Sequence, residues 1–199
     1  MDSGAENYRR FLGGDDDGLA DIIREYQSGL FAFLKNMVRD ETTAEELTEE
    51  TFVRVGIRKP RFSGQSSFQT WLYAIGRHAA LDHLRKRPMT EALPLEDCGE
   101  IPDLISPEIV CLRDEDKAAV RRAMTRLKPA YRQVLWLIYF EGFTVKETAR
   151  IMKKSVHATE NLASRARQAL KAELTRVHRP AVAGNAAATL NDTEGGYAE

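Results

Sequence analysis

The chain has 199 residues, of which 43% are hydrophobic and 30% charged, and its formal net charge is −1 at pH 7. These values indicate a globular protein with one ordinary domain or two small ones. The longest apolar run, residues 134–140, is far shorter than the roughly 20 residues of a membrane span. The first residues lack the basic start and apolar core of a secretory signal, so we expect a cytoplasmic protein without membrane insertion.

The two cysteines of the chain, Cys98 and Cys111, lie in a stretch that is rich in acidic residues and proline. Neither has a CxxC partner, nor a histidine at the spacing of a metal ligand. In a reducing compartment we therefore expect two free thiols, with no disulfide and no metal or other cofactor.

Charge is distributed unevenly along the chain. Residues 52–88 contain eight Lys or Arg and one Asp, whereas residues 91–116 contain nine acidic residues and one Arg. Residues 117–179 contain fifteen Lys or Arg and four Glu. Two basic modules therefore flank an acidic connector, and clustered positive charge is typical of surfaces that bind nucleic-acid phosphates.

The sequence patterns divide the chain into five segments. They are a flexible N-terminus (1–18), a first helical domain (19–88), an acidic flexible linker (89–116), a second helical domain (117–178) and a disordered tail (179–199). Every strong periodic signal is helical, which predicts an all-α fold of two small domains. The linker could extend to about 90 Å at about 3.3 Å per residue.

In the first domain, apolar residues at i, i+3, i+4 and i+7 predict a helix over residues 19–37. A second helix is expected to begin at Thr43, whose hydroxyl would form a capping box with Glu46. The Lys-Pro and Ser-Gly pairs between residues 59 and 64 should end this helix.

The third expected helix, residues 68–87, begins with aromatic residues and ends in a basic cluster. Its spacing places Trp71, Leu72 and Ile75 on one inner face, so we interpret Trp71 as a core residue. Phe68 lies at the edge of the preceding loop, where either a core or a base-stacking role fits. Tyr73 is assigned to the outer face.

In the second domain, a helix over residues 116–127 precedes one that begins with Pro129 in its first turn. Thr144 and Glu147 should form a capping box that opens a short helix, and Ser155 should cap the next one. This longer helix is expected to bury Val156, Thr159, Ala163, Ala166, Leu170 and Leu174. A short helix, a tight turn and a longer helix with a polar outer face are typical of a helix-turn-helix unit.

Two blocks of sequence resemble a known family. The block TWLYAI…ALDHLR and the segment LKPAYRQVLWLIYFEGFTVKETARIMKKSVHATENLASRARQAL are similar to the two parts of an extracytoplasmic-function (ECF) sigma factor of bacterial RNA polymerase. The similarity covers residues 19–88 and 117–175, in the family's order and with a linker between them. It implies a dissociable polymerase subunit that is not itself an enzyme.

The resemblance also implies partners. These are core RNA polymerase, through its β′ clamp helices and β subunit, and promoter DNA in double- and single-stranded form. The sequence leaves open whether an anti-sigma protein holds the factor inactive. In such proteins the acidic linker threads through the polymerase, although a plain soluble spacer explains its composition equally well.

The resemblance assigns one helix to docking on the clamp helices. The residues concerned are Glu46, Leu47, Glu49, Glu50, Phe52 and Arg54. For any one glutamate a solvated acidic face is the alternative, because exposed charges are the norm on helices.

For the −10 element, the family's loop before the third helix grips a flipped base, and the helix contacts nearby bases and phosphates. The corresponding residues are Phe62, Ser63, Gly64, Gln65, Ser66, Ser67, Tyr73, Arg77, His78, Arg85, Lys86 and Arg87. Unstacking a base costs a few kcal/mol, which aromatic stacking of about 1–3 kcal/mol per base offsets. His78 stands where the family commonly has asparagine, and a solvated helix residue is its alternative interpretation.

For the −35 element, the resemblance points to the second helix of the helix-turn-helix unit. Its candidate residues are Ser155, His157, Glu160, Asn161, Ser164, Arg165, Arg167, Gln168 and Lys171. Asparagine suits adenine and glutamate can accept a hydrogen bond from cytosine N4, whereas Arg165 and Arg167 suit phosphates.

Two other classes of protein were weighed. An autonomous helix-turn-helix regulator explains residues 117–175 but leaves the block FSGQSSFQTWLY without a role. A helical enzyme acting on nucleic acid would need metal-ligating carboxylates near the basic surface. The carboxylates instead cluster in the linker and in the helix around residues 45–50.

Overall fold

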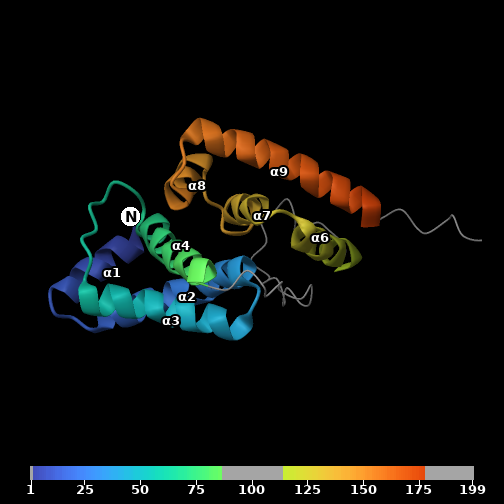
Figure 1. Ribbon diagram of the computed structural model, residues 1–199. Helices are drawn as coiled ribbons and strands as arrows, with labels where there is room; N and C mark the ends of the chain where they lie inside the picture. The colour runs from blue at the N-terminus through green and yellow to red at the C-terminus, as the bar shows by residue number, and fades with distance from the viewer. Residues whose placement is uncertain (1, 87–113, 178–199) are drawn as a thin grey trace, which may run out of the picture.

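The computed structural model describes residues 2–86 and 114–177, and within these ranges all regular structure is helical (Figure 1). The first module contains α1 (Ser3–Leu12), α2 (Asp17–Val38), α3 (Glu41–Arg58) and α4 (Phe68–Lys86). The second contains α6 (Asp114–Arg126), α7 (Pro129–Leu135), the π-helix η1 (Trp136–Phe140), α8 (Val145–Met152) and α9 (Val156–Val177). The all-α prediction is confirmed. The expected tail, both cysteines, Arg87 and most of the expected linker lie outside the described residues.

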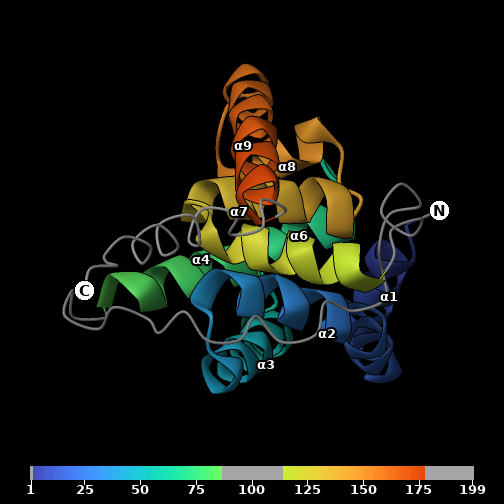
Figure 2. The same ribbon diagram turned by 90° about the vertical axis from the view of Figure 1, so that its right-hand side faces the viewer.

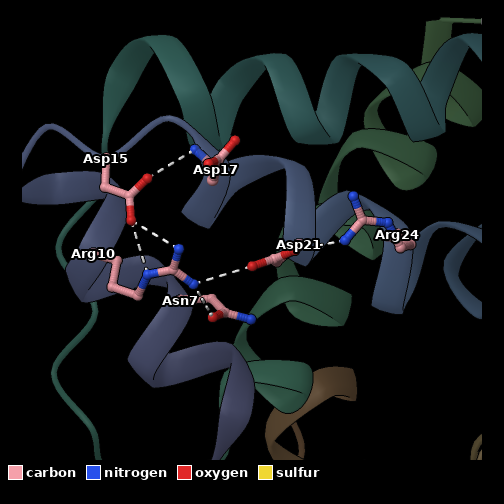
Figure 3. A network of polar contacts seen from close by, with 6 residues as sticks. All are labelled: Asn7, Arg10, Asp15, Asp17, Asp21 and Arg24. Carbon is pink, nitrogen blue, oxygen red and sulfur yellow. Dashed lines mark hydrogen bonds and ion pairs between the residues drawn. The ribbon is translucent and has the colours of Figure 1, made fainter.

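The expected flexible N-terminus is wrong, because a packed helix begins at Ser3. The Asp2 side chain caps α1, and Tyr8 and Phe11 are buried against the rest of the module. Arg10 bridges Asp15 and Asp21, so a polar network joins α1 to the start of α2 (Figure 3). Tyr8 and Phe11 are the only large apolar side chains that α1 buries in the core. Two such residues give too weak a periodic signal to predict the helix from sequence.

The core of the first module forms where α2 packs against α1, α3 and α4. Its largest fully buried side chains include Ile22, Leu30, Phe33, Leu34 and Leu72. The i, i+3, i+4 pattern in residues 19–37 therefore identified the inner face of α2 correctly.

The start of α3 differs from the expectation. The helix begins at Glu41, and the Asp40 carboxylate accepts a hydrogen bond from the Thr43 backbone amide at 2.8 Å. Thr43 is thus a residue of the first turn and not the cap. Aspartate caps at least as well as threonine, so the earlier acidic residue takes this position.

The local signals of the second module are confirmed. Pro129 occupies the first turn of α7, and Thr144 with Glu147 forms the capping box of α8. The Ser155 hydroxyl accepts a hydrogen bond from the Ala158 amide at the start of α9. Lys153 makes the turn between α8 and α9 with a φ of 53°, a left-handed conformation that glycine adopts more readily.

The two modules are packed together. Trp136 and Leu137 extend the same buried core as Phe33 and Leu34. Arg132 of α7 is 4% exposed, and its Nε donates to the Asn36 carbonyl of α2 at 2.9 Å. In Figure 2, α9 stands on the side of the second module that faces away from α2 and α3. The prediction of two domains described their helices but did not foresee this contact.

Candidate nucleic-acid and protein interfaces

The outer face of α3 carries acidic and apolar residues. Glu46, Glu49 and Glu50 are exposed, and Arg54 forms an ion pair with Glu50 at 2.6 Å. The resemblance also assigned Leu47 and Phe52 to docking, but they lie on the inner face that helical spacing indicates and are only 4% and 7% exposed. The structure therefore corrects the assignment of Leu47 and Phe52 as residues that a partner can reach.

The apolar residues that α3 does expose are Val53, at 53%, and Ile57, at 78%. They follow Glu46 and Glu50 at helical spacing, so all four lie along one stripe of the helix. Sequence reasoning missed Val53 and Ile57. Continuing the helical spacing from Glu50 by one turn reaches Val53, and by two turns it reaches Ile57, so the pattern could have identified both.

The loop between α3 and α4 presents a short polar tip. Ser63, Gly64 and Gln65 are exposed, and Gly64 has a φ of 70°, which favours glycine. Phe62 turns inward and packs edge-on against Phe68, with ring centroids 5.7 Å apart. Of the residues expected in the −10 loop, the structure thus leaves the central three most accessible.

The ends of this loop region are more constrained. Ser66 and Ser67 are partly buried, and the Ser67 hydroxyl accepts a hydrogen bond from the Thr70 amide at 3.3 Å. Ser67 therefore caps the first turn of α4. The ambiguity over Phe68 is also resolved, because its ring is fully buried, whereas Trp71 is partly buried beside it.

Tyr73 is not on an outer surface, contrary to expectation. It is 1% exposed, its ring stacks on Phe33, and Phe143 of the second module packs against its edge. Its hydroxyl donates to Glu141 at 2.6 Å. The second module covers this part of α4, a contact across 68 residues of sequence that helical periodicity cannot indicate.

Glu141 lies at the centre of a small polar cluster between the modules. One carboxylate oxygen accepts from Tyr73 and the other from Trp136 Nε1 at 2.9 Å. Burial raises the pKa of Glu141, although both hydrogen bonds act in the opposite direction. Burial and the Glu141 charge together raise the pKa of Tyr73 well above its usual value.

The π-helical turn η1 explains the position of Glu141. The Glu141 amide donates to the Trp136 carbonyl five residues earlier, so the chain makes a wider turn than an α-helix. The Trp136 and Phe140 rings stack at 4.5 Å within this turn. The sequence predicted a helix here but not its wide turn.

Arg77 also faces the second module. Its Nε donates to Gln133 of α7 at 3.2 Å, and burial lowers its pKa. His78 is exposed and its Nδ1 lies 3.0 Å from Asp82. Arg85 and Lys86 are exposed, so the free basic surface of α4 is confined to its C-terminal end.

Helix α8 reaches the candidate −10 loop. Arg150 donates to the backbone carbonyl of Gln65, and the Ser67 hydroxyl donates to Glu147 at 3.4 Å. Two residues expected in the loop are therefore engaged by the second module in this arrangement.

Helix α9 presents an open polar face. The exposed candidates are Ser155, His157, Glu160, Asn161, Arg165, Arg167, Gln168 and Lys171, and Ser164 is partly exposed. Asn161 Nδ2 lies 3.1 Å from His157 Nε2, and Arg167 donates to the Tyr139 hydroxyl at 3.3 Å.

The buried face of α9 agrees with the expectation in part, because Leu170 and Leu174 are only partly buried. Thr159, Ala163 and Ala166 are buried, but Val156 is 44% exposed. Val156 is the first residue of α9. An apolar side chain therefore stands among the polar candidates of this face.

Neither a metal site nor a membrane span is found in the part of the chain that the structure describes. There, no three His, Cys, Asp or Glu residues gather as metal ligands would. None of the helices in residues 2–86 and 114–177 is both long and apolar enough to cross a bilayer.

Comparison with known families finds two matches. The description "Sigma-70 region 2" matches residues 22–88, and "Sigma-70, region 4" matches residues 117–170. The first match coincides with α2, α3, the loop and α4, and the second with the helix-turn-helix module. Each module therefore matches a region of the same family. An autonomous helix-turn-helix regulator would explain only the second module.

Curated relatives extend over most of the chain. The RNA polymerase sigma-H factor of Pseudomonas aeruginosa is 30% identical, over 84% of this chain and 92% of its own length. The ECF RNA polymerase sigma factor SigW of Bacillus subtilis is 26% identical, over 81% and 91%.

Solved structures agree with the fold. CnrH, in complex with the cytosolic domain of CnrY, has a TM-score of 0.65 at 20% identity and covers 88% of this chain and 99% of its own. The sigma factor RpoE of Bartonella quintana, in complex with the anti-sigma factor NepR, has a TM-score of 0.62 at 22% identity, over 80% and 98%.

Proposed function

Because this chain belongs to the extracytoplasmic-function group of the sigma-70 family of RNA polymerase sigma factors, we propose that it binds core polymerase and directs promoter recognition and DNA melting. The observation that carries this proposal is the presence of both family regions in order, one with an exposed loop and the other with an open polar helix. Such a factor works as a non-catalytic subunit in the cytoplasm, where the polymerase acts.

The stripe on α3 is the proposed docking surface for the β′ clamp helices. Glu46, Glu49 and Glu50 supply charge, and the exposed Val53 and Ile57 supply apolar contact area. An acidic patch next to exposed apolar residues suits a protein interface, which combines apolar contact area with polar contacts. Leu47 and Phe52 would support this surface from within.

Substitutions on α3 test the docking surface. Glu50→Lys should weaken binding to core polymerase at least tenfold, because it reverses a charge and loses the pair with Arg54. Glu41→Lys is the matched control: it also reverses an exposed glutamate and loses an ion pair, with Lys35 at 3.0 Å, but it lies about 180° around the helix axis from Glu50. Equal core affinity of the two variants would contradict this surface.

The −10 element would be read by the loop tip at Ser63–Gln65, with His78, Arg85 and Lys86 contacting the strand. Small polar side chains and a glycine allow close approach to an extruded base, and exposed cations suit its phosphates. Tyr73 and Arg77 lie against the second module, so their use requires the modules to separate. The chain between the modules is long enough to allow this.

The −35 element would be read by α9. His157, Glu160, Asn161 and Ser164 are the candidates for base edges, and Arg165, Arg167, Gln168 and Lys171 for phosphates. Val156 adds an apolar side chain at the start of the helix, suited to a thymine methyl group. Both promoter elements are thus assigned to surfaces of opposite modules.

A regulatory partner is proposed on the ground of the solved relatives. RpoE of Bartonella quintana is described in complex with an anti-sigma factor. We infer that an anti-sigma protein also binds this chain.

In vitro transcription tests the proposed function directly. Purified core polymerase is supplied with a genomic promoter library, with and without this protein. New start sites that share sequence upstream at −10 and −35 are the expected result. No new start sites, together with a sharp duplex footprint by the protein alone, would replace the proposal with an autonomous regulator.

A further inference from the structure

Both ends of the α3–α4 loop are attached to α1, a helix that lies outside the matched family regions. At the start of the loop, the Pro60 carbonyl accepts a hydrogen bond from the Tyr8 hydroxyl. At its end, the Phe68 amide donates a hydrogen bond to the Asp2 carboxylate. The exposed tip at Ser63–Gln65 lies between these two anchors. The position of the tip therefore depends on a segment about 60 residues earlier in the chain.

The Asp2 carboxylate joins the N-termini of two helices. One oxygen accepts from the Ala5 amide at 3.2 Å and caps α1, while the other accepts from the Phe68 amide at 2.6 Å and caps α4. The first-turn amides of a helix lack intrahelical partners and carry its positive end, so a carboxylate stabilises both termini at once. This contact fixes where α4 begins.

Tyr8 and its neighbours on α1 hold the start of the α3–α4 loop. The Tyr8 hydroxyl donates to the Pro60 carbonyl at 2.8 Å, and its ring packs on Phe68 and Trp71. One turn further along α1, Phe11 lies under the Lys59 ammonium, 4.6 Å from the ring centroid. Lys59 has a φ of 42° at the end of α3, so α1 supports the residue that turns the chain into the loop.

Close packing makes the attachment rigid. A Cβ on Gly4 would lie 2.5 Å from the Phe68 ring, which is buried and cannot move aside. A Cβ on Gly18 would lie 2.4 Å from the Asn7 carbonyl of α1. With the Arg10 network of Figure 3, these approaches fix α1 on α2 and α4.

We propose that Asp2 and Tyr8 are positioning residues for −10 recognition, which they serve by fixing both ends of the loop that reads the extruded base. The inference rests on the proposed function. The two side chains do not touch DNA. They determine where the three exposed tip residues lie relative to α4, and an extruded base is selected by short contacts that a displaced loop cannot make.

Two substitutions separate positioning from folding. Asp2→Asn keeps a side-chain oxygen for the α1 cap, since asparagine caps as well as aspartate, but its NH₂ group cannot accept from the Phe68 amide. Tyr8→Phe keeps the ring and removes only the bond to Pro60. Ser3→Ala is the matched control, because it removes a 2.6 Å contact between α1 and Glu25 of α2 and leaves both loop anchors in place.

The experiment uses the full chain with core polymerase on the strongest promoter found above and on its single-base −10 variants. In Asp2→Asn, discrimination between the best and altered −10 sequences should fall about tenfold, equivalent to about 1.4 kcal/mol. Tyr8→Phe should lose about fivefold. Core affinity and binding to the −35 duplex should stay within about twofold of wild type, and hydrogen exchange at the Phe68 amide should accelerate in Asp2→Asn.

The outcomes are distinguishable. A wild-type protein that starts no transcription contradicts the proposed function and the positioning role together. If wild type reads promoters and both variants keep its discrimination, only the positioning role is overturned. Equal loss in Ser3→Ala, or a parallel fall in core affinity, would show that α1 merely stabilises the fold and would also overturn it.

Discussion

The two helices proposed to read DNA, α4 and α9, differ in how much of their face is free. The polar side chains of α9 are exposed along most of its length, whereas Tyr73 and Arg77 of α4 are held by Glu141 and Gln133. The proposed −35 face is thus accessible to a duplex, while the proposed −10 face is partly engaged within the protein. Substitutions on α4 should therefore affect stability and closure, and those on α9 should affect DNA binding alone.

The largest effect is expected at the start of α4. Phe68→Ala removes a fully buried ring that contacts Tyr8, Tyr26 and Trp71, and should lower the free energy of unfolding by about 3–5 kcal/mol. Trp71→Ala should cost less, because that ring is only partly buried. Urea unfolding of both variants checks the order, and a larger loss in Trp71→Ala would contradict it.

Separation of the modules should follow from Glu141→Ala. The change leaves the Tyr73 hydroxyl and Trp136 Nε1 without their acceptor, which should shift the equilibrium between closed and open forms by about 2 kcal/mol, or roughly thirtyfold. Small-angle scattering should then report a larger radius of gyration. Glu160→Ala, at an exposed site of α9, should leave that radius unchanged. An unchanged radius in Glu141→Ala would mean that the other contacts between the modules, such as those of Arg132 with Asn36 and of Arg77 with Gln133, keep the closed form.

A smaller and more selective effect is expected on α9. Asn161→Ala should leave the free energy of unfolding within about 0.5 kcal/mol, because the side chain is exposed. The variant should also lose about 1–3 kcal/mol of discrimination at one base pair of the −35 duplex. Fluorescence anisotropy with duplexes altered one base pair at a time provides the measurement. A uniform loss over all duplexes would reassign Asn161 to phosphate contact.

The smallest effect is a dependence of closure on pH. Because burial raises the pKa of Glu141, its contribution to closure is fully present below its ordinary pKa of 4.5 and is lost as pH rises through the folded value. Glu147 acts in the opposite sense: although burial raises its pKa, hydrogen bonds from Thr144 lower it overall, so its contribution is lost on acidification. The difference between wild type and Glu141→Gln isolates the first group. Scattering at a series of pH values above 4.5 should show a trend in wild type that the variant lacks.

The closed arrangement bears on the proposed function. CnrH, solved with the cytosolic domain of CnrY, and RpoE, solved with the anti-sigma factor NepR, share the fold over most of their length. In this chain, Tyr73, Arg77 and the Gln65 carbonyl are engaged by its own second module. Release of these contacts is thus a step that our proposed function requires before the −10 element can be bound in full.

The sequence alone determined the features that depend on neighbours within one or two turns. The inner face of α2, Pro129 in the first turn of α7, the Thr144–Glu147 capping box and the polar face of α9 all follow from helical period and local hydrogen bonding. These interactions join residues at most four positions apart, so the pattern contains them.

Only the tertiary structure decided which of these faces are covered. Tyr73 is buried under the second module and hydrogen-bonded to Glu141, 68 residues away, and α1 attaches to a loop about 60 residues later. Val156, at the start of α9, is 44% exposed although the apolar period assigned it to the buried face. Burial at these positions depends on partners distant in the sequence, and helical spacing does not specify which partner will meet a given face.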